Sequence, residues 1–233
     1  MINLIDVYKL NSNELEENNI KEKPSIEEVL KPTTRRTRLD SRGSKEYDYE
    51  REFLNPTLNE TQVVLQSTFS CAGKDLNKRY IETIGAGPCV IVTLYDTENH
   101  NGAMAHLDSR SDVLKALEIM AQKINHNKSS LEVRIIGGHI QERSSRQIIS
   151  SISGFALRTG NKIVEEDILS DEDSKSVVLD TETGKLYNLP DNYVNKFSKI
   201  QLDKYINKME EIQNDYELDM GKTIYLDQKD FSL

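Results

Sequence analysis

An apolar, β-branched run at 89–96 (CVIVTLYD) is the feature that most limits how this chain can fold. A run of this length and composition indicates a buried strand. It is followed by TENHNG at 97–102, which suits a tight turn because asparagine and glycine tolerate positive φ angles. AMAHLD at 103–108 then reads as a return strand, so the sequence predicts a β-hairpin over 89–108.

Further strands and helices are predicted on both sides of this hairpin. TQVVLQSTF alternates apolar and polar residues, as a strand does, and SDVLKALEIMAQKI shows helical spacing behind Ser111, the expected cap. The predicted elements are strand 61–69, helix 111–124, strand 131–139, helix 144–160 with a glycine stop, hairpin 175–189 and a charged helix 197–213. This order favours an α+β class, a layered mixed or antiparallel sheet packed against helices, over a doubly wound parallel sheet.

Composition divides the chain into a folded core and two less apolar ends. Only 36% of the 233 residues are hydrophobic, so part of the chain is expected to stay outside the core. Residues 1–60 are rich in charge and show no sustained period, which predicts a flexible N-terminal arm with one short helix at 25–31. We expect a single catalytic domain at 61–195, followed by a C-terminal helix and acidic tail at 196–233.

Charge and cysteine content limit the function classes. The formal net charge of −9 argues against a nucleic-acid partner, and the chain contains no apolar run long enough for a membrane span. Two cysteines and no classical secretory signal predict a cytoplasmic location. An Asn- and Lys-rich composition without tryptophan is typical of an AT-rich bacterial genome. With the charged arm, it raises a second hypothesis, an effector or toxin translocated into a host or target cell.

The segment TIGAGPC at 83–89 carries the strongest chemical signal. Its glycines and proline predict a sharp turn that presents Cys89 at the start of a strand. The hairpin brings His106 to the same end, which gives a thiol and an imidazole in the arrangement that nucleophilic catalysis needs. A third group must orient the imidazole, and Thr83 is the first candidate. Asp108, two residues after the histidine and on the same face, is the weaker one.

Other residues are weighed against plainer structural roles. A lone cysteine at a strand start is more often a small buried hydrophobe, and a lone histidine on a strand is more often structural. Gly87, whose backbone N–H can receive an oxyanion, and His139, after a Gly-Gly pair, are supporting site candidates. Cys71 has no histidine at a recognisable spacing and is expected to be structural. No zinc-type spacing occurs, so a metal site is not expected.

The pattern T-x-G-x-G-P-C, with a histidine seventeen residues after the cysteine, resembles the chemoreceptor glutamine deamidase family CheD. GAMAHLDSRSDV and the later LEVRIIGGHIQERSSRQIISSI resemble the N-terminal asparagine amidohydrolase family. Both belong to a wider group of cysteine deamidases that includes the catalytic domains of cytotoxic necrotizing factor toxins. The resemblance covers about residues 60–190. One departure is Pro88, where the CheD family usually has serine.

This resemblance implies a CheD-like deamidase fold and a catalytic set of Thr83, Cys89 and His106. The implied reaction is hydrolysis of a glutamine or asparagine side-chain amide in a protein substrate, through a thioester on Cys89 and without a cofactor. Two alternatives stay open at this point. One is an N-terminal asparagine amidohydrolase, which needs an acidic group to bind a free α-amino group. The other is a catalytically silent binding or adaptor module on the same fold. The oligomeric state stays open.

Overall fold

The computed structural model describes residues 37–40, 43–46, 51–74, 76, 78–125, 130–169, 174–190 and 207. In chain order the elements are β1 Thr37–Asp40, β2 Gly43–Glu46, the 3₁₀ helix η1 Leu58–Glu60, β3 Thr61–Val64, β4 Thr68–Gly73, β5 Tyr80–Ala86, β6 Val90–Asp96, β7 Asn101–Leu107, α3 Val113–Ile124, β8 Glu132–Gly137, α4 Arg143–Thr159, β9 Lys162–Ile168, β10 Lys175–Asp180 and β11 Leu186–Asn188. The predicted helices at 25–31 and 197–213 lie outside the described residues, apart from residue 207.

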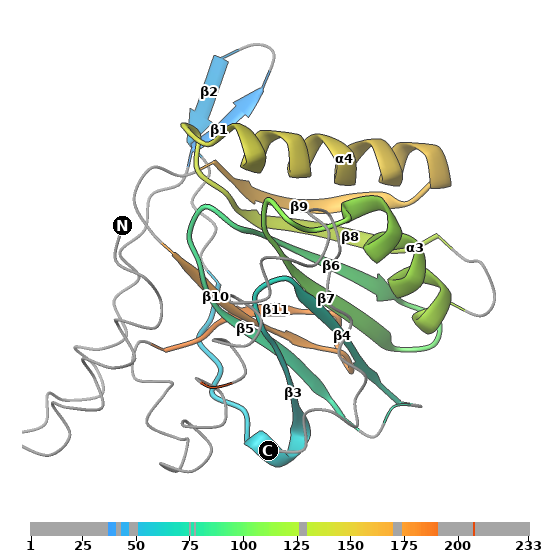
Figure 1. Ribbon diagram of the computed structural model, residues 1–233. Helices are drawn as coiled ribbons and strands as arrows, with labels where there is room; N and C mark the ends of the chain where they lie inside the picture. Colours follow the sequence, from blue (N-terminus) through green and yellow to red (C-terminus); the bar gives the residue numbers. More distant parts are fainter. Residues whose placement is uncertain are drawn as a thin grey trace, which may run out of the picture.

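The fold is a layered α+β sandwich, as predicted. Helices α3 and α4 cover one face of a five-stranded sheet with the order β4-β7-β6-β8-β9, and a four-stranded sheet, β11-β10-β5-β3, covers the other face (Figure 1). Both sheets are mixed, because β3–β5 and β8–β9 are parallel pairs among antiparallel ones. The central sheet is therefore buried on both faces.

The position of β6 in the central sheet explains why its sequence is apolar throughout and does not alternate with polar residues. Val90, Val92 and Leu94 belong to the core cluster that packs against the helices. Ile91, between them, belongs to the cluster between the two sheets. Each of these side chains is fully buried. A strand covered on both faces needs an apolar residue at nearly every position, and this accounts for the run from which the hairpin was predicted.

Several predicted elements are confirmed with small changes. The hairpin over 89–108 is present as β6 and β7, and α4 ends at Gly160 in the left-handed conformation (φ 71°). Helix α3 is present, but the prediction of Ser111 as its cap was wrong. The Asp112 side chain accepts from the Lys115 N–H instead, because Ser111 is used by the preceding turn, where its Oγ accepts from the Asp108 N–H.

The single strand predicted over 61–69 was wrong. The chain forms β3 in one sheet, breaks at 65–67 and continues as β4 in the other sheet. Ser67 has a positive φ of 62°, so a serine takes the backbone conformation that usually marks glycine. A pattern of alternating apolar and polar residues does not show where the chain passes from one sheet to the other, because the alternation can continue through the crossing.

Four strands were not predicted. β1 and β2 lie within residues 1–60, which were expected to form a flexible arm. β5 includes the first half of the segment that was expected to be a turn, and β9 carries the charged sequence KIVEEDI. β9 is an edge strand whose acidic side chains are paired: the buried Arg51 contacts Glu165 and donates to Asp167 at 2.9 Å. Part of the segment expected to be an arm thus packs on the sheets, while the boundaries at 60 and 195 stay predictions.

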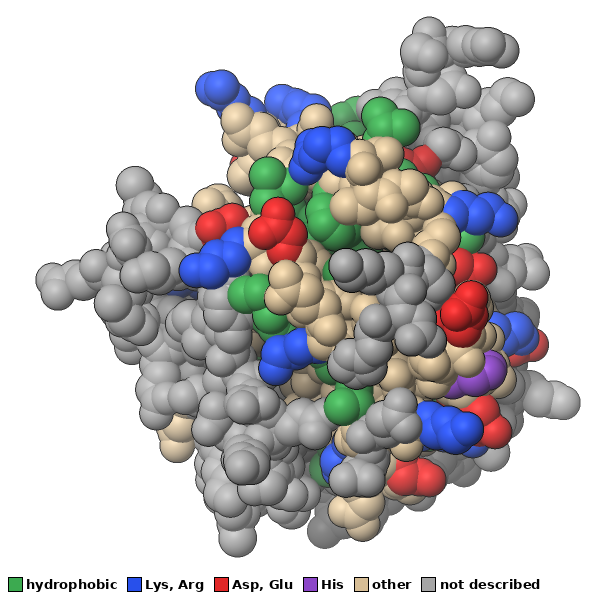
Figure 2. All heavy atoms as spheres, turned by 90° about the vertical axis from the view of Figure 1, so that its right-hand side faces the viewer, with side chains coloured by type: hydrophobic (Ala, Val, Ile, Leu, Met, Phe, Trp, Pro, Cys, Tyr) green, Lys and Arg blue, Asp and Glu red, His purple; other side chains and the backbone are tan. Residues whose placement is uncertain are grey.

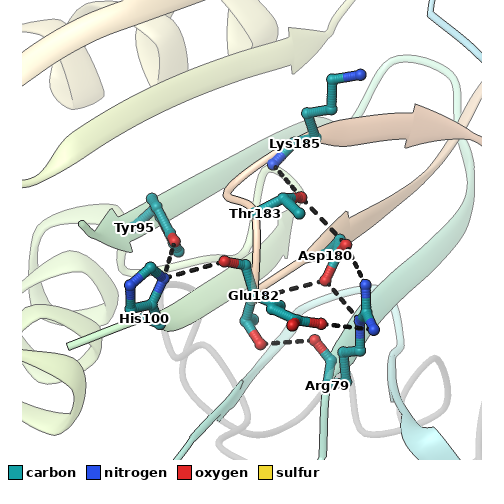
Figure 3. Close-up of polar contacts among 8 residues, drawn as sticks. Arg79, Tyr95, His100, Asp180, Glu182, Thr183 and Lys185 are labelled. Atoms are coloured by element: carbon teal, nitrogen blue, oxygen red, sulfur yellow. Dashed lines mark hydrogen bonds and ion pairs between the residues drawn. The ribbon is translucent and has the colours of Figure 1, made fainter. Parts of the chain in front are cut away.

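A polar network joins the two sheets at the end where β6 ends and β7 begins (Figure 3). Arg79 donates to Asp180 at 2.9 and 2.8 Å and also pairs with Glu182. His100, in the β6–β7 turn, lies 3.0 Å from the Tyr95 hydroxyl and 3.0 Å from the Glu182 carbonyl oxygen. The turn of one sheet is therefore held against the turn of the other.

Gly184→Ala is expected to destabilise this end by about 2–4 kcal/mol, combining left-handed strain with overpacking. Gly184 has φ 71°, and a Cβ there would lie 2.4 Å from the Tyr95 ring. Gly160→Ala is the matched control, because Gly160 has the same φ of 71° with nothing within 4 Å of the added Cβ. It should cost only about 1 kcal/mol. Urea unfolding of both variants measures the difference, and equal losses would contradict the packing argument.

One face of the molecule is mixed in charge. Figure 2 shows acidic and basic side chains interspersed, with hydrophobic side chains in separate spots among them. Leu157 on α4 is the most exposed large hydrophobic side chain in the described part, at 85%. No helix among the described residues combines the length and the hydrophobicity that crossing a membrane requires.

Candidate active site

The hydroxyl of Thr83 and the ring of His106 meet between the two sheets. Thr83 lies on β5 and His106 on β7, and Thr83 Oγ1 is 2.8 Å from His106 Nδ1. The same oxygen lies 2.8 Å from the carbonyl oxygen of Val64 on β3. Both side chains are buried, with exposed fractions of 0% and 2%. A polar contact therefore joins the two sheets within the buried layer between them.

These two contacts assign the tautomer of His106. The Val64 carbonyl can only accept, so the single hydrogen of the Thr83 hydroxyl is donated to Val64 O. The hydroxyl oxygen then accepts from His106 Nδ1–H. In the neutral ring the lone pair is left on Nε2. His106 is thus held in the form that a general base requires.

Cys89 lies at the end of the hairpin that carries His106. Ile91 pairs with His106, so Cys89, two residues earlier, is a diagonal neighbour of the histidine on the adjacent strand. Cys89 and Ile91 belong to the cluster between the sheets, the side on which His106 meets Thr83. Diagonal neighbours have Cβ atoms about 7 Å apart or closer, within reach of long side chains. The three predicted residues therefore share one end of this layer.

Burial sets the protonation of the thiol and the imidazole. The pKa of Cys89 is raised to about 12, first by burial and then by the charge of Asp108, which Arg110 opposes. The pKa of His106 is lowered to about 4 by burial, and Asp108 acts in the opposite direction. At neutral pH the resting site holds a neutral thiol and a neutral imidazole, so a thiolate forms only by proton transfer to a base.

The segment from Gly85 to Pro88 carries the chain from one sheet to the other. Gly85 (φ 70°) forms a β-bulge opposite Ser176, whose Oγ accepts from the Gly85 N–H at 3.0 Å. The bulge lets both Thr83 and the buried Ala86 face the core. Gly87 borders open space, since a Cβ on it would meet nothing within 4 Å. This predicted supporting residue therefore lies on the accessible side of the thiol-bearing turn.

The Gly137-Gly138 turn holds the backbone of Cys89. Gly138 N–H donates to the Cys89 carbonyl oxygen at 2.8 Å, and a Cβ on Gly137 (φ 87°) would lie 2.9 Å from that oxygen. His139 is half-buried, and its N–H donates to Ser145 Oγ at 3.2 Å, which in turn donates to the residue before Cys89 at 2.6 Å. His139 thus contacts this region through its backbone.

Asp108, the other supporting candidate, is the centre of a network that the sequence did not reveal. Its Oδ2 accepts from Ser67 Oγ at 2.5 Å, Gln66 Nε2 at 3.0 Å, and Arg110 Nε and Nη2 at 3.0 and 2.7 Å. Its Oδ1 accepts from the Arg110 N–H at 2.9 Å and from Ser111 Oγ at 3.3 Å. Arg110, two residues after Asp108, was readable as its partner from spacing, whereas Gln66 and Ser67 gave no signal.

The chemical groups gathered here are a thiol, an imidazole and a hydroxyl. They match the nucleophile, base and orienting group of covalent catalysis. Within the described ranges, no cluster of at least three histidine, cysteine, aspartate or glutamate side chains is placed to hold a metal ion.

Comparison with known proteins places this geometry in a family. The profile of the family described as protein N-terminal asparagine amidohydrolase matches residues 57–165, a range that contains Thr83, Cys89 and His106. A probable chemoreceptor glutamine deamidase CheD from Methanosarcina barkeri is 31% identical over 126 residues, which cover 46% of this chain and 83% of the relative. The chain belongs to the CheD family. Both matches are to amidohydrolases, so this CheD-family chain is an enzyme of the deamidase type.

Thr83→Val is expected to lower the kcat of this CheD-family enzyme about 10²-fold, the low end of what general acid–base catalysis contributes. Valine keeps the shape of threonine but removes the partner of both His106 Nδ1 and Val64 O. Losing both contacts in a buried site should cost about 1–3 kcal/mol of unfolding free energy. Ammonia release and urea unfolding measure the two effects. Thr83→Ser keeps the hydroxyl and should retain most activity; equal losses in both variants would contradict the orienting role.

Proposed function

We propose that this chain is a cysteine-dependent protein amidohydrolase that deamidates a glutamine or asparagine side chain through a thioester. Cys89 is the nucleophile, His106 the general base and acid, and Thr83 the group that orients His106. The observation that carries the proposal is the contact of Thr83 Oγ1 with both His106 Nδ1 and Val64 O, because it leaves Nε2 as the acceptor. The hairpin register supports it by making Cys89 a diagonal neighbour of that histidine.

The first half of the reaction forms the thioester. Nε2 of His106 takes the Cys89 proton while the sulfur attacks the amide carbon, so the carbonyl π bond breaks and an oxyanion forms. In this proposal the backbone N–H groups near Gly87 receive that oxyanion. The imidazolium then gives its proton to the amide nitrogen, the C–N bond breaks and ammonia leaves.

The second half restores the enzyme. Nε2 of His106 takes a proton from water, and the hydroxide that forms attacks the thioester carbon. The C–S bond breaks, the sulfur recovers the proton from His106, and a carboxylic acid is released that ionises at neutral pH. One neutral amide on the target becomes one negative charge. No step needs a group beyond water and the protein itself.

The substrate class is a side chain within a protein. The M. barkeri relative is described as acting on chemoreceptor glutamine, whereas the matched family profile is described by an N-terminal asparagine reaction. An N-terminal substrate needs a carboxylate that can accept from an α-ammonium group. Asp108 is the acidic residue whose charge acts on the thiol, and both of its oxygens already accept from Gln66, Ser67, Arg110 and Ser111. This saturation favours an internal glutamine or asparagine.

Matched peptides test this choice. Wild type and Cys89→Ala would be incubated with acetylated peptides holding one internal Gln or Asn, and with a peptide that begins with a free Asn. Ammonia and the mass gain of about one dalton that replaces NH₂ with OH are measured. We expect conversion of an acetylated peptide by wild type alone. Conversion of only the free N-terminal Asn would support the N-terminal amidohydrolase, and equal ammonia release by Cys89→Ala would overturn the cysteine mechanism.

A further inference from the structure

Two separate loops supply the side chains that hold the Asp108 carboxylate. Gln66 and Ser67 come from the break between β3 and β4, and Arg110 comes from the turn between β7 and α3. Asp108 is 7% exposed and Ser67 2%, so the carboxylate is held away from bulk water. A buried carboxylate is tolerated only where donors satisfy it, and here they do.

The network holds the backbone of His106 as well as the Asp108 carboxylate. Ser67 N–H donates to the His106 carbonyl oxygen at 2.8 Å, while Ser67 Oγ donates to Asp108 and accepts from Arg110 Nη2 at 3.0 Å. Ser67 adopts a positive φ of 62° to make these contacts together. A non-glycine residue in that region is strained and persists only when its surroundings hold it there. The strain therefore marks the loop as tied to the site.

Asp108 directly follows β7 and lies one position beyond the Leu107–Val90 pair, opposite Cys89 in the continuation of the hairpin register and two residues after His106. The geometry points to a charge pair: we propose that Asp108 and Arg110 form a fixed positioning pair that balances the thiolate–imidazolium state of Cys89 and His106. This rests on the proposed function of those two residues. Asp108 stabilises the positive imidazolium, and Arg110 offsets the repulsion that Asp108 exerts on the thiolate.

The pair acts on a proton transfer that creates two charges in a buried site. Without fixed countercharges, both would be penalised by desolvation. The direction of each influence agrees with this role. Asp108 raises the pKa of both Cys89 and His106, and Arg110 lowers that of Cys89. These are the charged groups that act on the thiol and the imidazole among the described residues.

The test is the alkylation rate of Cys89 by iodoacetamide between about pH 7 and 11, read by mass spectrometry at Cys89, together with kcat and KM on a glutamine peptide. Because the pKa of the thiol is raised to about 12, the alkylation midpoint is defined here as the pH at which the rate reaches about one tenth of the wild-type rate at pH 11. Asp108→Asn should shift the alkylation midpoint to lower pH, because a charge opposing the thiolate is removed. It should also lower kcat about 10-fold or more with little change in KM, since the imidazolium loses its countercharge. Arg110→Gln should shift the midpoint the opposite way.

Conservative variants keep the test informative if a neutral variant folds poorly. Arg110→Lys retains the charge and should leave the midpoint near that of wild type. Ser67→Ala retains both charges and removes only the contacts of the Ser67 hydroxyl with Asp108 and Arg110. Glu118→Gln, on the exposed face of α3, is the control for a general charge effect and should change nothing.

Opposite shifts from the two neutral variants support the pair. Shifts in the same direction, or none in folded protein, overturn it and leave the network a structural clamp. That outcome is separate from failure of the proposed function, which would appear as deamidation by Cys89→Ala.

Discussion

Cys89→Ala is expected to abolish deamidation, with a loss of at least about 10³-fold in kcat/KM, because the atom that forms the covalent intermediate is gone. The fold should survive, since the thiol fills a small part of the inter-sheet cluster and alanine removes one atom from it. Ammonia release measures the first effect, and circular dichroism with urea unfolding measures the second.

The chain supplies its own matched control for that experiment. Cys71 is also buried and outside any disulfide, but it belongs to the cluster between the five-stranded sheet and the helices, on the opposite face of the sheet from His106. Cys71→Ala should therefore keep full activity while losing a similar amount of packing. A large loss in Cys71→Ala alone would contradict the assignment of Cys89 as nucleophile.

His106→Gln is expected to reduce kcat by about 10²–10⁴-fold, the range that a positioned general acid–base group contributes. Glutamine keeps hydrogen-bonding capacity near Thr83 but cannot take a proton from the thiol at neutral pH. Substrate binding should change little. A variant that retains more than a tenth of wild-type kcat would show that another group serves as the base.

The same variant also changes stability at acid pH. The pKa of His106 is lowered from its ordinary value of 6.5, which applies to the unfolded chain, to about 4 in the folded protein. Between these values the unfolded state binds more protons, so the free energy of unfolding of wild type falls as pH decreases. As the pH falls through this window, the free energy of unfolding of His106→Gln should decrease by about 3 kcal/mol less than that of wild type. Urea unfolding at intervals between pH 7 and 4 measures the difference, at each pH relative to Glu118→Gln.

The hairpin and its two site residues were predictable because local signals there agree with one another. The apolar run at 89–96 indicated a strand, the Asn-Gly turn indicated reversal, and counting along the two strands brought Cys89 and His106 together. Thr83 was a candidate because its hydroxyl lies six residues before Cys89, and the resemblance implied the same role. The hydrogen bond to His106 requires that β5 lie against β7 across two sheets, and no local pattern encodes that contact.

The features that sequence did not predict depend on long-range partners. β9 is charged, and two of its acids, Glu165 and Asp167, pair with Arg51, more than a hundred residues earlier. The crossing at Ser67 looks like part of one strand, because no glycine or proline marks it. The Asp108 network also joins residues about forty positions apart, Gln66 and Ser67 with Asp108. Each of these three features can be explained only from the contacts in the packed structure.

The division of the site between sheets makes catalysis a measure of tertiary packing. Thr83 comes from one sheet, whereas His106 and the strand beside it come from the other, so neither sheet alone contains an oriented imidazole. An expanded, molten form that kept both sheets and the far-ultraviolet signal but let them separate would lose the Thr83 contact. Activity should then disappear before secondary structure during gentle acid or denaturant treatment. Deamidation would therefore serve as a measure of how closely the two sheets pack against each other.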